Sequence, residues 1–91
     1  MNTILRAQAL REMDISETPD GKQHCFSIKF EKKDGELVFL PRAVKTGLRF
    51  SMNEHRMRGV LPVDQQMNRI GHVYPVHIDN IYEYNNQIVK L

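Results

Sequence analysis

The chain has 91 residues and a mass of 10.7 kDa, which predicts one domain over residues 1–91, because domains usually contain about 100–200 residues. Hydrophobic residues make up 41% and charged residues 26% of the sequence, values that exclude disordered and collagen-like chains. No apolar run reaches the roughly 18 residues of a membrane span, and the charged N-terminal segment is unlike a signal peptide. A single cysteine, Cys25, excludes an internal disulfide. We therefore expect a soluble cytoplasmic protein.

Positive charge is concentrated in one part of the chain. The formal net charge is only +2, but residues 42–59 contain five basic residues and one acidic residue. The segments on either side are close to neutral. Such asymmetry carries information about partners rather than about the fold.

The first predicted element covers residues 5–15, where five of the six odd positions are apolar. A period of two is typical of a half-buried strand. The Ala, Leu and Glu content suits a helix equally well, so a helix is kept as the alternative to the predicted strand. Residues 18–21, Thr-Pro-Asp-Gly, predict the turn that follows.

A β-hairpin is predicted for residues 24–40, where apolar and polar residues alternate on both sides of Asp34-Gly35. A two-residue Asp-Gly loop between alternating runs is a strong hairpin signal. This loop length places Phe30 opposite Phe39 and predicts a cross-strand aromatic pair on the buried face.

Alternation also predicts strands over residues 48–52, 57–63 and 70–78, with turns between them. Two prolines modify these expectations, because proline cannot donate a hydrogen bond to a sheet. Pro41 is expected to end its strand or to place it at an edge. Pro75 indicates an edge strand or a bulge.

The C-terminal residues predict one more hairpin, over residues 81–91, with Asn85-Asn86 in the left-handed conformation of a tight turn. The whole pattern predicts an all-β, mainly antiparallel fold, a small six- or seven-stranded barrel or barrel-like sandwich built from hairpins. The expected core contains Leu5, Phe26, Ile28, Phe30, Leu37, Phe39, Leu48, Phe50, Leu61, Val63, Val73 or Tyr74, and Tyr82.

No motif for catalysis or metal binding is found in the sequence. His24 and Cys25 are adjacent, so on a strand they point to opposite faces, and His72 and His77 diverge in the same way. No zinc-ligand spacing, nucleophile elbow or Gly-rich phosphate loop is present. We expect a protein that is not an enzyme and that uses no metal and no small-molecule cofactor.

The basic block is the candidate binding site. On the outer face of one hairpin its arginines would form a strip, and the planar guanidinium suits phosphate recognition. The strip is predicted to contact nucleic-acid phosphates without reading sequence, although a solvated strand face without a ligand is the alternative. The candidate nucleic-acid-binding residues are Arg42, Lys45, Arg49, Arg56 and Arg58.

A stacking platform for single-stranded nucleic acid is not predicted, because Phe50 is expected to point inward and no exposed aromatic residue is then interleaved with these arginines. Tyr82 and Tyr84 are the candidates for such a platform. We expect both to cap the core instead.

Residues 39–44 (FLPRAV) and 68–76 (NRIGHVYPV) are similar to segments of small accessory proteins carried by bacterial phages and conjugative elements. The resemblance implies either an accessory nucleic-acid binder or a small structural or adaptor subunit. In the second role, a homo-oligomer or protein complex would form when residues 70–78 or the C-terminal strand pair with a partner's edge.

Overall fold

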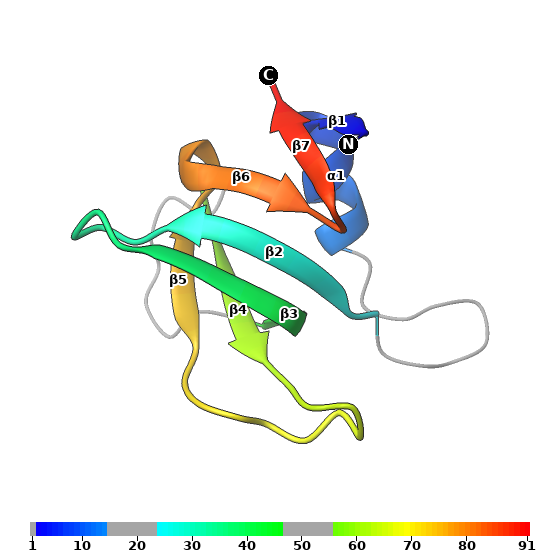
Figure 1. The fold of residues 1–91 in the computed structure, drawn as a ribbon, viewed down its shortest axis with the longest axis vertical. Helices are drawn as coiled ribbons and strands as arrows, with labels where there is room; N and C mark the ends of the chain where they lie inside the picture. The colour runs from blue at the N-terminus through cyan, green and yellow to red at the C-terminus, as the bar shows by residue number, and fades with distance from the viewer. Residues whose placement is uncertain (1, 15–23, 47–55) are drawn as a thin grey trace.

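A computed structural model describes residues 2–14, 24–46 and 56–91. In these residues seven strands form one twisted sheet with the order β1-β7-β6-β2-β3-β4-β5 (Figure 1). All neighbours are antiparallel except β1 and β7, which are parallel. The elements are β1 (Thr3–Leu5), α1 (Arg6–Met13), β2 (Phe26–Glu31), β3 (Leu37–Thr46), β4 (Met57–Pro62), β5 (Tyr74–His77), the 3-10 helix η1 (Ile78–Asn80), β6 (Ile81–Tyr84) and β7 (Gln87–Lys90).

The prediction of an all-β, mainly antiparallel fold is confirmed. The sheet is bent so that its inner face encloses the core, but it does not close into a complete barrel, because the edge strands β1 and β5 do not pair with each other. None of the helices in the described residues is long and apolar enough to cross a membrane.

The strand predicted for residues 5–15 is wrong over residues 6–13, because these form α1. A helix brings Ala9 and Met13, four residues apart, onto one face, and both are buried against the inner face of the sheet. Leu5, which the strand pattern placed in the core, is 58% exposed. The helical alternative was therefore the correct one for this segment.

The first hairpin has a three-residue loop instead of the predicted two-residue loop. Lys32 N–H donates to the Glu36 carbonyl over 2.8 Å, and Gly35 adopts a φ of 91° between them. Glycine accepts this conformation at no steric cost, which is typical of three-residue hairpin loops. The register consequently shifts by one residue, so Phe30 lies opposite Val38 rather than opposite Phe39. A one-residue shift moves a side chain to the other face.

A β-bulge in β3 explains why Pro41 does not end the strand. Phe26 pairs with Ala43 and Ile28 pairs with Leu40, so two residues of β3 lie opposite one residue of β2. Proline is tolerated at such a bulge. Beyond it, β3 pairs with β4 as well, and the expectation that Pro41 ends or edges its strand is wrong.

A second bulge lies in β6 at Tyr82, between the pairs Lys29–Glu83 and Phe30–Ile81. The extra residue reverses the alternation of the strand, so Ile81 and Tyr84 are both buried while Tyr82 is 43% exposed. Tyr82 was expected in the core, and that expectation is wrong. Burial, with Glu12 nearby, raises the pKa of the Tyr84 hydroxyl far above its usual range.

The edge and turn predictions in the C-terminal half are confirmed. Pro75 lies in β5, an edge strand of the sheet. Asn85 and Asn86 adopt φ values of 49° and 63° in the turn between β6 and β7, as a tight hairpin with the right-handed strand twist requires.

The core consists of one large cluster on the inner face and a smaller cluster on the outer face of β3 and β4. Of the predicted core residues, Phe26, Ile28, Phe30, Leu61 and Val63 are buried. Leu37 and Phe39 are exposed, because the hairpin register turns them outward. Leu48 and Phe50 lie outside the described residues.

Candidate functional site

The predicted basic residues do not lie on one continuous face. Arg42 lies in the β3 bulge, and Lys45 lies three positions later on the same strand. Side chains an odd number of positions apart on a strand point to opposite faces. Arg56 precedes β4 and Arg58 lies within it, while Arg49 is outside the described residues.

Lys45 and Arg58 meet at Asp14, directly after α1. Lys45 Nζ lies 3.3 Å from Asp14 Oδ1, and Arg58 binds both carboxylate oxygens, with Nε 3.0 Å from Oδ1 and Nη2 3.4 Å from Oδ2. Arg58 Nη1 also donates to the Met57 carbonyl over 3.0 Å, and only 14% of the Arg58 side chain is exposed. These contacts join the end of α1 to β3 and β4, which is a structural role.

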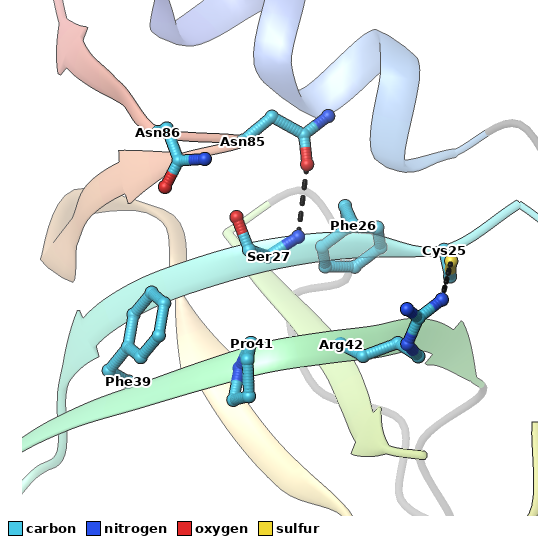
Figure 2. A pocket seen from close by; sticks show the side chains of 8 residues that line it. All are labelled: Cys25, Phe26, Ser27, Phe39, Pro41, Arg42, Asn85 and Asn86. Atoms are coloured by element: carbon cyan, nitrogen blue, oxygen red, sulfur yellow. Dashed lines mark hydrogen bonds between the residues drawn. The ribbon is translucent and has the colours of Figure 1, made fainter. Parts of the chain in front are cut away.

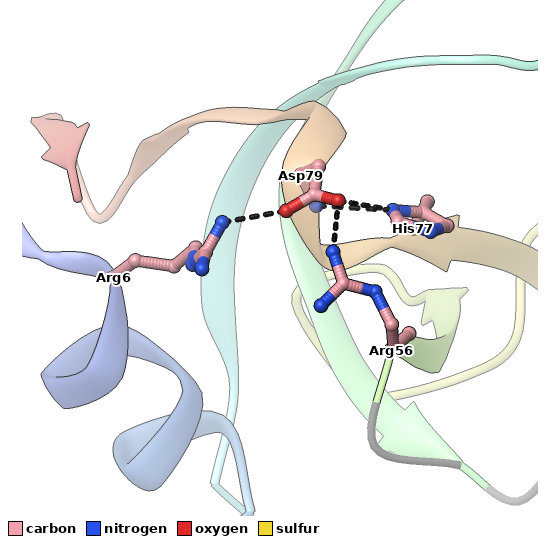
Figure 3. Close-up of polar contacts among 4 residues, drawn as sticks. All are labelled: Arg6, Arg56, His77 and Asp79. Atoms are coloured by element: carbon pink, nitrogen blue, oxygen red, sulfur yellow. Dashed lines mark hydrogen bonds and ion pairs between the residues drawn. The ribbon is translucent and has the colours of Figure 1, made fainter. Parts of the chain in front are cut away.

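Arg56 belongs to a second cluster, around Asp79 of η1 (Figure 3). Its guanidinium binds Asp79 Oδ2, while Arg6 at the start of α1 approaches from another side and donates to Oδ1 over 2.6 Å. His77 Nδ1 accepts the Asp79 backbone N–H over 3.2 Å and caps η1. Arg6 and Arg56 are fifty residues apart in the sequence, and no sequence pattern predicts that they meet.

The pKa of the Asp79 carboxyl is held below its usual value of 3.8, chiefly by the hydrogen bond from Arg56 and against a partial opposing effect of desolvation. A lowered pKa stabilises the folded state above the usual pKa, and this contribution disappears as the pH falls through the folded pKa. We therefore expect the melting temperature of the wild type to fall more steeply below about pH 4 than that of Asp79→Asn. Parallel melting curves between pH 6 and pH 2.5 would contradict this expectation.

An open cleft of about 470 Å³ lies over β2, β3 and the β6–β7 turn (Figure 2). It contains one predicted site residue, Arg42, together with residues that the sequence did not indicate. Its lining consists of Cys25, Phe26, Ser27, Phe39, Pro41, Arg42, Asn85 and Asn86.

The turn that forms one wall of the cleft is fixed to β2. The backbone N–H of Asn85 donates to the Ser27 carbonyl over 2.9 Å, and the Asn85 side-chain oxygen accepts the Ser27 N–H over 2.9 Å. Since the left-handed Asn85-Asn86 pair is held in this way, the wall is positioned by the backbone before any ligand binds.

The other wall contains an exposed aromatic ring and a cation, with Pro41 between them. Phe39 is 53% exposed, and Figure 2 shows it on β3 with Pro41 and Arg42. The Arg42 guanidinium contacts Cys25 Sγ at 3.8 Å, and no carboxylate in the described part of the chain pairs with it. Arg42 therefore differs from Lys45, Arg56 and Arg58, each of which has an acidic partner.

The same outer face carries a second exposed aromatic residue and a lysine. Lys29 lies directly opposite Phe39 on β2 and pairs with Glu83 of β6 at 3.6 Å. The hydroxyl of Tyr82 donates to Glu31 Oε1 over 2.7 Å, which orients the ring. The sequence pattern missed this surface because it assigned both Phe39 and Tyr82 to the core. If the hairpin is given a three-residue loop that ends in Gly35, the register predicts that Phe39 points outward.

Among the described residues no group of three or more His, Cys, Asp or Glu side chains is placed to hold a metal ion. A comparison of the chain with protein-family models, with curated proteins and with solved structures finds no match.

Proposed function

We propose that this protein is a non-enzymatic binding module that holds single-stranded nucleic acid in the cleft between β3 and the β6–β7 turn. The observation that carries the proposal is that one cleft is lined by the exposed Phe39 ring and by Arg42, a guanidinium without a carboxylate partner in the described residues. An aromatic ring stacks on any base, and an arginine in the same cleft binds the phosphates of the strand.

The ion pairs of the basic block favour a single strand over a duplex. Lys45 and Arg58 already contact Asp14, so a strip of duplex phosphates would have to compete with this carboxylate. Bases of a single strand are unstacked and available to an exposed ring, as in other sheet-based binders of single strands. The binding surface therefore moves from the predicted hairpin to the outer face of β2 and β3.

The edge-strand alternative is less favoured by the hydrogen-bond pattern of β5. Ile78 N–H donates to the Arg56 carbonyl over 2.9 Å. Alternation along the antiparallel ladder then places the Pro75 nitrogen toward the free edge. Proline has no N–H to offer a partner strand there. The C-terminal strand β7 lies between β1 and β6, so both of its edges are occupied within the chain.

Fluorescence anisotropy with labelled single- and double-stranded oligonucleotides tests the proposal. We expect the single strand to bind more tightly and with little dependence on sequence. Phe39→Ala should weaken binding about tenfold, the effect of losing one base–aromatic stack. Arg42→Gln should also weaken binding and should make the salt dependence shallower by about 0.7 in the slope of log K against log salt.

Arg69→Gln is the matched control, because it removes the same charge from an exposed residue outside the cleft. It should leave affinity nearly unchanged, and circular dichroism should show all three variants folded. Equal losses for Arg42→Gln and Arg69→Gln would indicate a nonspecific effect of net charge, and the absence of binding at low salt would exclude the proposed function.

A further inference from the structure

Asp14 and Asp79 each bind two Lys or Arg side chains, and His77 Nδ1 also lies 3.4 Å from Asp79 Oδ2. The two clusters differ in how many N–H donors their arginines use. At Asp14, Arg58 directs Nε and Nη2 to the carboxylate and Nη1 to the Met57 carbonyl, and it is largely buried. The donors of that guanidinium are engaged in holding the fold.

At Asp79, Arg6 and Arg56 each use a single terminal nitrogen for the carboxylate. A guanidinium has five N–H donors, so most of the donors of Arg6 and Arg56 have no acceptor in the described residues. Their side chains are 27% and 47% exposed. Two guanidinium groups against one carboxylate also leave an excess of positive charge at a position open to solvent.

We propose that Arg6 and Arg56 form a binding site for a phosphoryl group, with Asp79 as the internal counter-ion that holds the two guanidinium groups in place. Since Arg6 and Arg56 reach the two oxygens of one carboxylate, the two guanidinium groups lie close together, and a phosphate beside them can accept several charge-assisted hydrogen bonds at once. The ligand is inorganic phosphate or the terminal phosphate of a larger molecule. None of these residues lines the cleft, so the site is independent of the proposed function.

The local backbone keeps the site in position. His77 caps η1 by accepting the Asp79 N–H, and Ile78 is hydrogen-bonded to the Arg56 carbonyl over 2.9 Å. The backbone that carries Arg56 is therefore tied directly to the turn that carries Asp79. Arg6 is placed by the start of α1, whose inner face is buried in the core.

Isothermal titration with inorganic phosphate, against chloride at matched ionic strength, tests the site on the full chain. Arg6→Gln and Arg56→Gln should each weaken phosphate binding about tenfold, because each removes a charge-assisted interaction. Asp79→Asn keeps a side-chain oxygen that accepts a hydrogen bond but removes the competing charge. It should therefore tighten binding about fivefold, the effect of removing a like charge at about 4 Å in water.

Asp14→Asn is the matched control, because it removes the same charge from the cluster whose guanidinium, that of Arg58, has its donors engaged. It should leave phosphate affinity unchanged. Equal tightening by Asp14→Asn and Asp79→Asn, or unchanged affinity in both arginine variants, would overturn the proposal, as would heats no larger with phosphate than with chloride. If Asp79→Asn does not fold, the two arginine variants still decide the question.

Oligonucleotides with and without a 5′-phosphate distinguish the two sources of the phosphoryl group. Tighter binding of the 5′-phosphorylated strand, lost in Arg56→Gln but retained in Phe39→Ala, identifies a terminal phosphate as the ligand. Equal binding of both strands together with a response to inorganic phosphate identifies the free anion. No response to inorganic phosphate and none to the 5′-phosphate excludes the site, whatever the outcome for the cleft.

Discussion

Replacement of Phe30 by alanine is expected to destabilise the protein by about 3–5 kcal/mol, the range for removing a buried aromatic ring. Phe30 is 1% exposed, and its ring packs edge-to-face on Tyr74 with the centroids 5.5 Å apart. Phe30 lies on β2 and packs against Tyr74 of β5. The cavity left by Phe30→Ala is therefore bordered by strands, and the movement of one loop cannot fill it. Urea unfolding followed by circular dichroism measures the free energy difference.

Phe39→Ala is the matched control for this experiment, because it removes the same ring from the other strand of the same hairpin. Phe39 is 53% exposed and lies opposite Lys29, so its loss should cost less than about 1 kcal/mol. Similar large losses for the two variants would mean that the rings face each other and that the two-residue loop register is right.

Met13→Ala is expected to cost about 2–5 kcal/mol, because Met13 is fully buried at the end of α1. Alanine preserves helix propensity, so the loss reports the packing of the helix on the sheet and not the stability of the isolated helix. Differential scanning calorimetry or urea unfolding measures it.

Two variants in the same segment separate a helix from a strand. In one continuous strand, Leu5 and Ala7 would have the same parity as Met13, but Leu5 at the end of β1 and Ala7 in α1 are both exposed. Leu5→Ala and Ala7→Lys should therefore change stability by less than about 1 kcal/mol. Losses comparable to that of Met13→Ala would contradict the helix.

The hairpins and the strand content of this protein were predictable from local sequence. Alternation over β2, the Asn85-Asn86 turn and the edge position of β5 at Pro75 all depend on interactions between neighbours in the chain or on the chemistry of a single residue. Such signals are present in any window of about ten residues, and the all-β class follows from them.

Residues 6–13 could not be assigned in this way, because the apolar residues fit both the period of a strand and the period of a helix. Alternation places Ala9 and Met13 on one side of a strand, and a helical period places them on one side of a helix. The sheet decides between the two, because a helix brings both residues onto the core while exposing Ala7 and Arg11.

The candidate binding residues were predictable as residue types but not as a site. The charge of the basic block is visible in the sequence. Which basic residues contact Asp14, which contacts Asp79 and which lines the cleft depends on contacts across α1, η1 and β4. Chain folding brings these partners together from segments that share no local pattern.

Local sequence determined that the chain forms short antiparallel strands, that turns lie at Asp34-Gly35 and Asn85-Asn86, and which segment is basic. Tertiary structure decided which aromatic rings face solvent, because one extra loop residue turns Phe39 outward and one bulge turns Tyr82 outward. Side-chain direction in a sheet reverses with each residue, so a register difference of one residue is enough to move a ring from the core to the surface that the proposed ligand would contact.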